Sequence, residues 1–262
     1  MNSNKIKTAL IFILCLYLSA CENPADNPGI LKKFSVLALL KSGSPEQKIT
    51  VYRTSTLSEK DYNTNAFFVS DAKVFISDSM DYNVRYAFRS KDYNKYYTNL
   101  QKYSFLPGRK YYLEVQAGDC IIKGTTIFPG DFSIEYPKDK DTVLIKENDR
   151  FNLPVKWNKS QGAFGYIVEV NTIQKIDDGE NVIESPWPTT FITRDNSINW
   201  SFYRPADNQY YKFLTTQITV SVTAFDKNYY DHHYEMYTSA GLKGAYGYFA
   251  SGITKTVKLD VK

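Results

Sequence analysis

The sequence predicts an all-β protein made of two tandem β-sandwich domains, which follow an export signal and a short tether. Short apolar runs alternate with polar residues at a period of two, which is the pattern of half-buried strands. The 262 residues include 22 Tyr and 16 Phe, which are enriched in strands, but only 2 His and 3 Cys. A β-sandwich takes roughly 100 residues, so the length after the signal fits two domains.

Residues 1–20 have the pattern of a lipoprotein signal peptide. Two lysines and no acid precede the ten-residue apolar core Ala9–Leu18, which has the length of a signal peptide and is too short to span a bilayer. The string Leu-Ser-Ala-Cys, ending at Cys21, resembles the bacterial lipobox, whereas an ordinary cleavage site beside a chance cysteine is the alternative. We therefore expect Cys21 to carry acyl chains such as palmitate, and residues 21–29, with two prolines and a glycine, to be the tether.

Residues 30–130 are predicted to form the first sandwich, an immunoglobulin-like one. Gly118-Asp119 separates two strand-like runs by two residues, which predicts a tight hairpin. Two polar, Tyr-rich stretches, Ser55–Ser70 and Ser90–Ser104, are predicted to be loops or short helices. Alternating apolar and polar residues predict strands in three runs: 49–52, 72–77 and 112–116.

Residues 131–262 are predicted to form the second sandwich, because Phe128-Pro129-Gly130-Asp131 interrupts the alternation. Apolar side chains from Phe151 to Trp157 fall on one face of a strand, which predicts that Trp157 lies in the core. Asp177-Asp178-Gly179 predicts a hairpin turn, since it lacks the spacing of a calcium-binding loop.

This second half resembles a fibronectin type III domain. The resemblance rests on the Trp that ends an early strand, on the strand Gly165–Val170 and on the late strand Thr219–Asp226. It extends from Asp131 to about Asp231 and implies a β-sandwich, to which a Tyr- and Gly-rich C-terminal segment is appended.

The chain after the signal is also similar to the Bacteroidota lipoproteins of domain-of-unknown-function family 4249. This family has no established catalytic residues, so the resemblance transfers none. It implies instead a location at the outer membrane beside TonB-dependent nutrient-uptake barrels. Glu22 and Asp26 after the lipid cysteine favour the cell surface over the periplasm, but they do not form the usual cluster of a surface-export signal, so the membrane face stays open. The lipobox is followed by the segments that carry the resemblance: Lys48–Ser55, Val69–Asp78, Pro107–Val115, Gly124–Pro129, Tyr229-Tyr230 and Gly241–Phe249.

No catalytic residue, metal site or cofactor motif is predicted. The two histidines, His232 and His233, would point to opposite faces of a strand, so both cannot serve one site. The sequence has no P-loop, GxGxxG or GxSxG motif, and no spacing singles out a pair of carboxylates. Cys120 opens a predicted strand, where a small buried residue is expected rather than a reactive thiol. Basic and acidic residues are interspersed at a net charge of +4, so we expect no nucleic-acid partner.

Aromatic residues are the candidate contacts with a ligand or partner. Trp187 lies between Pro186 and Pro188, where neither a regular helix nor a central strand can form, so it is expected to pack at the domain edge or to stack on a sugar or peptide. Tyrosine gives broad contact at low entropic cost, although ordinary tyrosines of a sheet surface are the alternative. The candidate tyrosines are Tyr93, Tyr96, Tyr97, Tyr229, Tyr230 and Tyr234.

We therefore expect a non-catalytic cell-envelope lipoprotein without a cofactor, held at the outer membrane through Cys21. Its expected role is that of an accessory binding subunit of a TonB-dependent nutrient transporter. The alternative is a surface lipoprotein that captures a glycan or peptide directly, and a hydrolase is the remote alternative.

Overall fold

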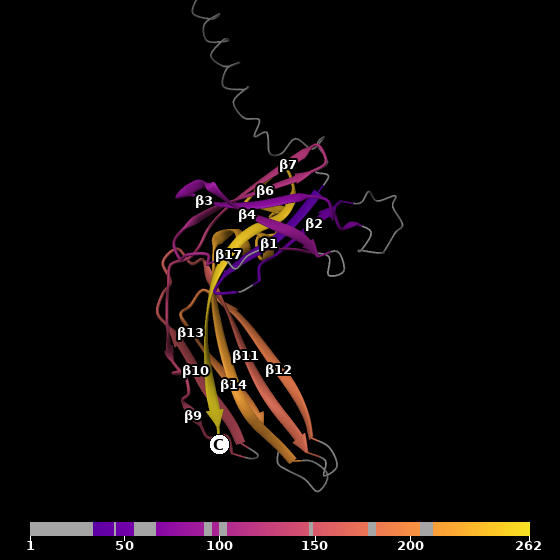
Figure 1. Cartoon of the computed structure of the whole chain (residues 1–262). Coiled ribbons are helices and arrows are strands. Elements are labelled where there is room, and N and C mark those ends of the chain that lie inside the picture. The colour runs from indigo at the N-terminus through magenta and orange to yellow at the C-terminus, as the bar shows by residue number, and fades with distance from the viewer. Residues whose placement is uncertain are drawn as a thin grey trace, which may run out of the picture. The chain divides into compact units, whose positions relative to one another are not determined.

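Strands are the dominant secondary structure of the described chain, and one short helix accompanies them. The computed structural model describes residues 34–44, 46–54, 67–91, 96–99, 104–146, 149–177, 182–204 and 212–262. Phe34–Lys262 is one compact unit (Figure 1). The expected signal peptide, the tether and Cys21 lie outside the described residues.

The first half supplies seven strands of one large sheet. They lie side by side in the order β1-β2-β5-β4-β3-β6-β7. The hairpin predicted at Gly118-Asp119 is confirmed, because Ala117 at the end of one strand pairs with Cys120 at the start of the next. The strands are β1 (Phe34–Ser42), β2 (Lys48–Arg53), β3 (Lys73–Asp78), β4 (Asp81–Lys91), β5 (Tyr96–Asn99), β6 (Lys110–Ala117) and β7 (Cys120–Ile127).

The second half adds a second layer. Strands β13, β10 and β8 form a separate three-stranded sheet, while β12-β11-β14-β17 continue the large sheet. The elements are β8 (Ile134–Tyr136), β9 (Thr142–Val143), β10 (Asp149–Trp157), β11 (Gly165–Asp177), β12 (Val182–Thr193), β13 (Ser197–Arg204), β14 (Lys212–Phe225), α2 (Lys227–His233), β15 (Ser239–Ala240), β16 (Leu242–Lys243) and β17 (Tyr246–Val261).

Trp157 joins the two layers of the second half. Its indole is completely buried, as predicted, and packs edge-on against Tyr166 of β11, with ring centroids 5.2 Å apart. Strand β11 pairs with β12 from Tyr166–Thr193 to Asp177–Val182, as the predicted hairpin requires, although the turn itself lies outside the described residues. The predicted fold class, all-β with sandwich-like sheets, is confirmed.

Strand β17 belongs to both halves. Its first residues pair in parallel with β1, and its later residues pair antiparallel with β14 (Figure 1). Gly247 makes this crossing possible, because its φ is +97° and a Cβ there would collide with the carbonyl oxygen of Val36 on β1. The C-terminal segment is therefore paired with the first half as well as with the second, and the division at residue 130 stays a prediction.

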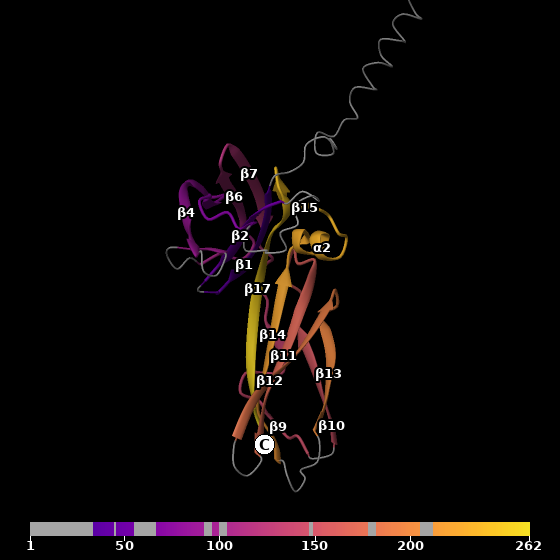
Figure 2. The ribbon, with the colours of Figure 1, turned by 90° about the vertical axis from the view of Figure 1, so that its right-hand side faces the viewer.

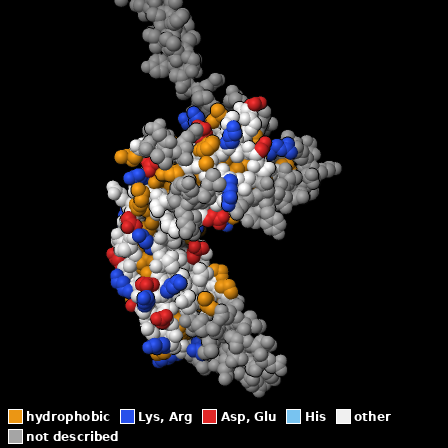
Figure 3. Space-filling view, viewed as in Figure 1, with side chains coloured by type: hydrophobic (Ala, Val, Ile, Leu, Met, Phe, Trp, Pro, Cys, Tyr) orange, Lys and Arg blue, Asp and Glu red, His pale blue; other side chains and the backbone are white. Residues whose placement is uncertain are grey.

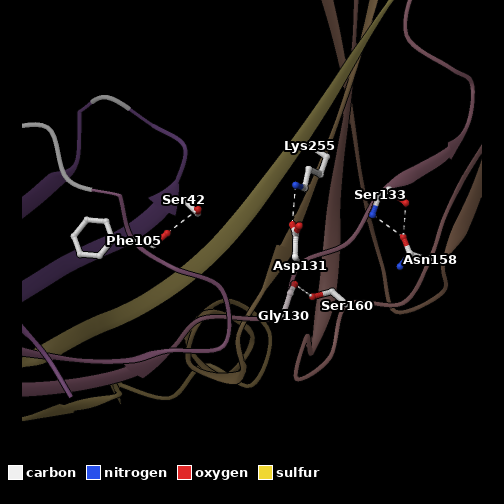
Figure 4. A network of polar contacts seen from close by, with 8 residues as sticks. All are labelled: Ser42, Phe105, Gly130, Asp131, Ser133, Asn158, Ser160 and Lys255. Carbon is white, nitrogen blue, oxygen red and sulfur yellow. Dashed lines mark hydrogen bonds and ion pairs between the residues drawn. The ribbon is translucent and has the colours of Figure 1, made fainter. Parts of the chain in front are cut away.

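The segment after β7 is held by polar contacts (Figure 4). The Ser160 hydroxyl donates to the Gly130 carbonyl at 2.5 Å, and the Asp131 carboxylate lies 2.7 Å from the Lys255 ammonium of β17. The hydrogen bond from Lys255 lowers the pKa of Asp131. The residues at the predicted boundary thus contact both β17 and the turn between β10 and β11.

One predicted loop is wrong. The stretch Ser90–Ser104 contains strand β5, which pairs with the end of β4 and with β2. Aromatic and Thr residues in Tyr96–Asn99 favour a strand once neighbouring strands are present, and those neighbours are distant in sequence. Of the predicted loop Ser55–Ser70, residues 55–66 lie outside the described part, and Phe68 bridges to Tyr52. In the described residues no helix is both long and apolar enough to cross a bilayer.

Candidate interaction site

Helix α2 gathers three of the predicted contact residues: Tyr229, Tyr230 and Tyr234. Strand β14 ends at Phe225, and the next residue, Asp226, caps the helix by accepting a hydrogen bond from the Tyr229 amide at 3.1 Å. The helix lies beside β15 and contacts β17 (Figure 2). It therefore starts where the chain leaves the large sheet.

The prediction that the two histidines lie on a strand is wrong. His232 and His233 form the last turn of α2, where successive side chains are about 100° apart instead of opposed. Both rings consequently pack against the ring of Tyr248 on β17, at centroid distances of 4.8 and 5.2 Å, and His233 also lies 4.2 Å from Tyr229. Burial, followed by the nearby His232, lowers the pKa of His233. The neutral ring is thus favoured in an aromatic cluster.

A cation–π cluster lies on another side of the helix. The guanidinium of Arg194 sits over the rings of Phe164 and Tyr230, 4.6 and 4.3 Å from their centroids. Tyr230 in turn stacks on Tyr234 at 5.1 Å. Sequence reasoning missed Arg194 and Phe164, because each is far from α2 in sequence and nothing in their local motifs marks them.

The chain that follows α2 presents large exposed side chains. Tyr234, Met236 and Tyr237 have 40%, 83% and 55% of their surface exposed. Lys227 and Asp231, one turn apart on the helix, form an ion pair at 2.5 Å, and the Lys227 ammonium lies 6.0 Å from the centroid of the Tyr237 ring. We call Tyr234, Met236 and Tyr237 the α2 edge. It combines apolar contact area with neighbouring charged and hydrogen-bonding groups.

Asp226 also joins the helix to the sheets. Its carboxylate accepts a hydrogen bond from the Thr126 hydroxyl of β7 at 2.6 Å, and the Ser251 hydroxyl of β17 lies 2.7 Å from that of Thr126. Burial raises the pKa of Asp226 to about 6, because its effect is larger than that of the hydrogen bonds, which lower the pKa. The start of α2 thus rests on a buried carboxylate that titrates near neutral pH.

Trp187 lies apart from this helix. It sits in β12, an edge strand of the large sheet, and 58% of its surface is exposed. The flanking prolines have no amide hydrogen, so they fit a strand that is paired on one side only. Along β12, Trp187 is six residues, roughly 20 Å, from Thr193, which pairs with Tyr166 near the start of α2. The structure therefore presents Trp187 and α2 as separate surfaces.

The predicted tyrosines of the first half have different environments. Tyr93 lies outside the described residues. Tyr96 donates a hydrogen bond to Glu46 at 2.9 Å and lies under the ammonium of Lys48. Tyr97 is only 1% exposed, and its hydroxyl is engaged with backbone atoms of the segment before β3. Tyr97 is thus a core residue rather than the surface contact that was expected.

Chemistry-bearing residues do not gather elsewhere in the described part of the chain. No group of three or more His, Cys, Asp or Glu side chains there has the arrangement of a metal site. Cys120 is a half-buried free thiol at the start of β7. On the face shown in Figure 3, lysine and arginine side chains are interspersed with acidic ones.

These features define a class of protein, an all-β chain with sandwich-like sheets. The chain is similar to the FN1–FN3 domains of chicken CNTN1, with 13% identity over 87% of this chain and 63% of that one, and a TM-score of 0.29. The chain is also similar to the complex of Dpr11 IG1 with DIP-gamma IG+IG2. The identity is 11%, the match covers 87% of this chain and 96% of that one, and the TM-score is 0.22. The chain spans less than two thirds of the CNTN1 fragment, and the similarity concerns the fold alone.

The particular family follows from the sequence match. The model of the family described as Domain of unknown function (DUF4249) matches residues 25–246, so the chain belongs to this family. No curated protein matches the chain. The family match covers the strands of the first half, most of the second half and helix α2.

Proposed function

We propose that this protein is a non-catalytic, lipid-anchored binding subunit that acts beside a TonB-dependent outer-membrane nutrient transporter. The observation that carries the proposal is the α2 edge, where Tyr234, Met236 and Tyr237 offer large exposed side chains directly after a helix that is capped by a buried residue. Aromatic residues and Met are enriched at protein interfaces. The aromatic and cation–π packing behind them restrains the helix before a partner binds, which reduces the entropic cost of association.

The anchor in this proposal is Cys21. Its supporting observations are the basic N-terminus, the apolar core and the Leu-Ser-Ala-Cys string. More than one acyl chain on this residue gives stable membrane attachment. Membership in DUF4249 supports the wider assignment to Bacteroidota lipoproteins of the outer membrane, facing the cell surface.

Affinity purification tests the partner. A C-terminally tagged protein would be recovered from gently solubilised membranes, and a β-barrel protein in stoichiometric amounts is the expected companion. In the variant Tyr234→Ser/Tyr237→Ser the companion should be lost. Tyr203→Ser is the matched control, because Tyr203 is similarly exposed but lies on β13 of the other sheet. Recovery of the lipoprotein alone, or equal recovery of the barrel with both variants, would contradict the proposal.

Direct capture of a glycan or peptide is the second candidate function. The observation that favours it is Trp187, whose exposed indole on the edge strand offers a flat face for stacking on a ring. Calorimetry with a glycan panel should show weaker binding for Trp187→Ala. Ile192→Ala is the control, because Ile192 is exposed on the same strand but five residues away, on the opposite face. Equal affinities of wild type and Trp187→Ala would exclude Trp187 from the role.

A further inference from the structure

The outer face of strands β3, β6, β7 and β16 forms an open groove that neither α2 nor Trp187 lines. Its volume is about 540 Å³, within the range of small-ligand sites. The groove is lined by residues from all four strands and by Gly241, which directly precedes β16. The lining residues are Phe75, Ser77, Tyr112, Leu113, Glu114, Lys123, Gly124, Thr125, Gly241, Leu242 and Lys243.

Strand alternation and register set the chemistry of this groove. Leu113 and Leu242 have buried side chains, so their neighbours Glu114 and Lys243 project from the outer face. The register then pairs Glu114 with Lys123, and Lys123 with Lys243, so that these side chains form a row across three strands. The row ends at Phe75 of β3, which pairs with Glu114 on its other side. A line of one aromatic, one acidic and two basic side chains therefore crosses the groove.

The two lysines of this row are neighbours, and Glu114 is the one acidic side chain in the row. Lys123 and Lys243 are direct cross-strand neighbours, and like charges in such positions destabilise a sheet. Within the described residues neither ammonium group takes part in an ion pair. Lys73 and Lys110 lie on the same face of β3 and β6. Four lysines against Glu114 give the described part of this face a positive charge, which is complementary to an anion.

An aromatic ring lies beside the charged row. Tyr112 is in the adjacent row, paired with Ser77 on one side and Thr125 on the other, and the ammonium of Lys110 is 5.2 Å from its ring centroid. An aromatic ring next to basic groups suits a ligand with an apolar ring face and an anionic substituent. The groove is hollowed, and its volume of about 540 Å³ has room for more than one sugar ring. The shape therefore favours a chain of sugar rings over a lipid surface.

We propose that this groove binds an acidic oligosaccharide, with a uronate carboxylate between Lys123 and Lys243 and a sugar ring against Tyr112 or Phe75. No bond is made or broken in this interaction. The site is independent of the α2 edge and of Trp187, and it does not require a transporter partner.

Calorimetry with two probes tests the proposal on the full detergent-solubilised chain. Hexagalacturonate should bind, with an affinity that falls as salt is raised, and a neutral hexasaccharide should bind at least tenfold more weakly. The variant Lys123→Gln/Lys243→Gln should lose at least tenfold in affinity for hexagalacturonate. The control Lys156→Gln/Lys258→Gln removes two exposed lysines from β10 and β17, so it keeps the same net charge as the test variant and should bind as wild type.

Three outcomes would overturn the proposal. The first is that both double variants bind hexagalacturonate with equal affinity. The second is that the acidic and neutral hexasaccharides bind equally well. The third is that hexagalacturonate does not bind, whereas phosphatidylglycerol vesicles bind and need Lys123 and Lys243 to do so. The last outcome would assign the lysines to a lipid surface. Both double variants change only exposed side chains, so circular dichroism should show both folded as wild type. If the groove fails to bind hexagalacturonate, the transporter test at the α2 edge is unaffected, because that test uses different residues.

Discussion

Replacement of Asp226 by Asn should change how stability depends on pH. The pKa of this carboxyl group rises from 3.8 to about 6 on folding, mainly through burial. Between these two values the folded protein holds a proton that the unfolded chain has released, so the contribution of Asp226 to stability falls as pH rises through this window. A shift of this size corresponds to on the order of 3 kcal/mol at neutral pH.

The Asn side chain keeps an oxygen acceptor for the Tyr229 amide and stays neutral at every pH. The free energy of unfolding of Asp226→Asn minus that of wild type should therefore grow by about 3 kcal/mol between about pH 3.5 and 7.5, following the folded-state pKa of about 6. Urea denaturation followed by circular dichroism at a series of pH values measures this difference. Asp195→Asn, in an exposed turn between β12 and β13, is the control.

A difference that stays constant with pH would refute the reasoning, since a buried carboxylate with a raised pKa must release its proton within this range. A difference that falls as pH rises would mean that hydrogen bonds from Thr126 and Ser251 outweigh burial, and that the pKa of Asp226 is lowered. Either result would remove the proposed titration at the start of α2.

Three further substitutions test packing and charge. Tyr97→Phe removes two hydrogen bonds to buried backbone and should lower the free energy of unfolding by about 1–3 kcal/mol in urea denaturation; an unchanged midpoint would mean that water replaces the hydroxyl. Gly247→Ala should cost at least about 1 kcal/mol, seen as a lower Tm, because the Cβ collides with Val36; a Tm at or above that of wild type would contradict this close approach. Lys255→Gln should cost at most about 1 kcal/mol at neutral pH, since its pairing with Asp131 is largely exposed. Because the pKa of Asp131 is lowered, the stability difference between wild type and Lys255→Gln should vanish as pH falls and Asp131 becomes protonated. If acid denaturation curves show the same difference at low pH, the ion pair is not the cause of the lower stability.

Local patterns were sufficient for many of the individual elements. The alternation from Phe151 to Trp157 predicted which side chains of β10 are buried, because successive side chains of a strand face opposite sides. Gly118-Asp119 predicted the β6–β7 hairpin, since two residues between strands leave room for little else. The prolines around Trp187 predicted that it is not in a central strand, and the structure places it in an edge strand.

Other features depend on residues that are far apart in the sequence. His232 and His233 were expected on a strand, but the short helix capped by Asp226 turns both toward Tyr248. The local composition of a seven-residue segment does not specify a helix, whose stability here comes from contacts with β15 and β17. The burial of Tyr97 also depends on distant segments, because β5 is buried only when β2 and β4 pair with it on either side.

The sequence alone determined the all-β class, the strand faces, the burial of Trp157 and the resemblance to DUF4249, all of which follow from local alternation or contiguous motifs. Three features are visible only in the folded chain: β17 pairs with strands of both halves, Asp226 is buried beside Thr126, and Lys123 lies next to Lys243. The physical reason is that a period of two states which side of a strand a residue occupies, whereas the choice of neighbouring strand and register depends on packing between distant segments.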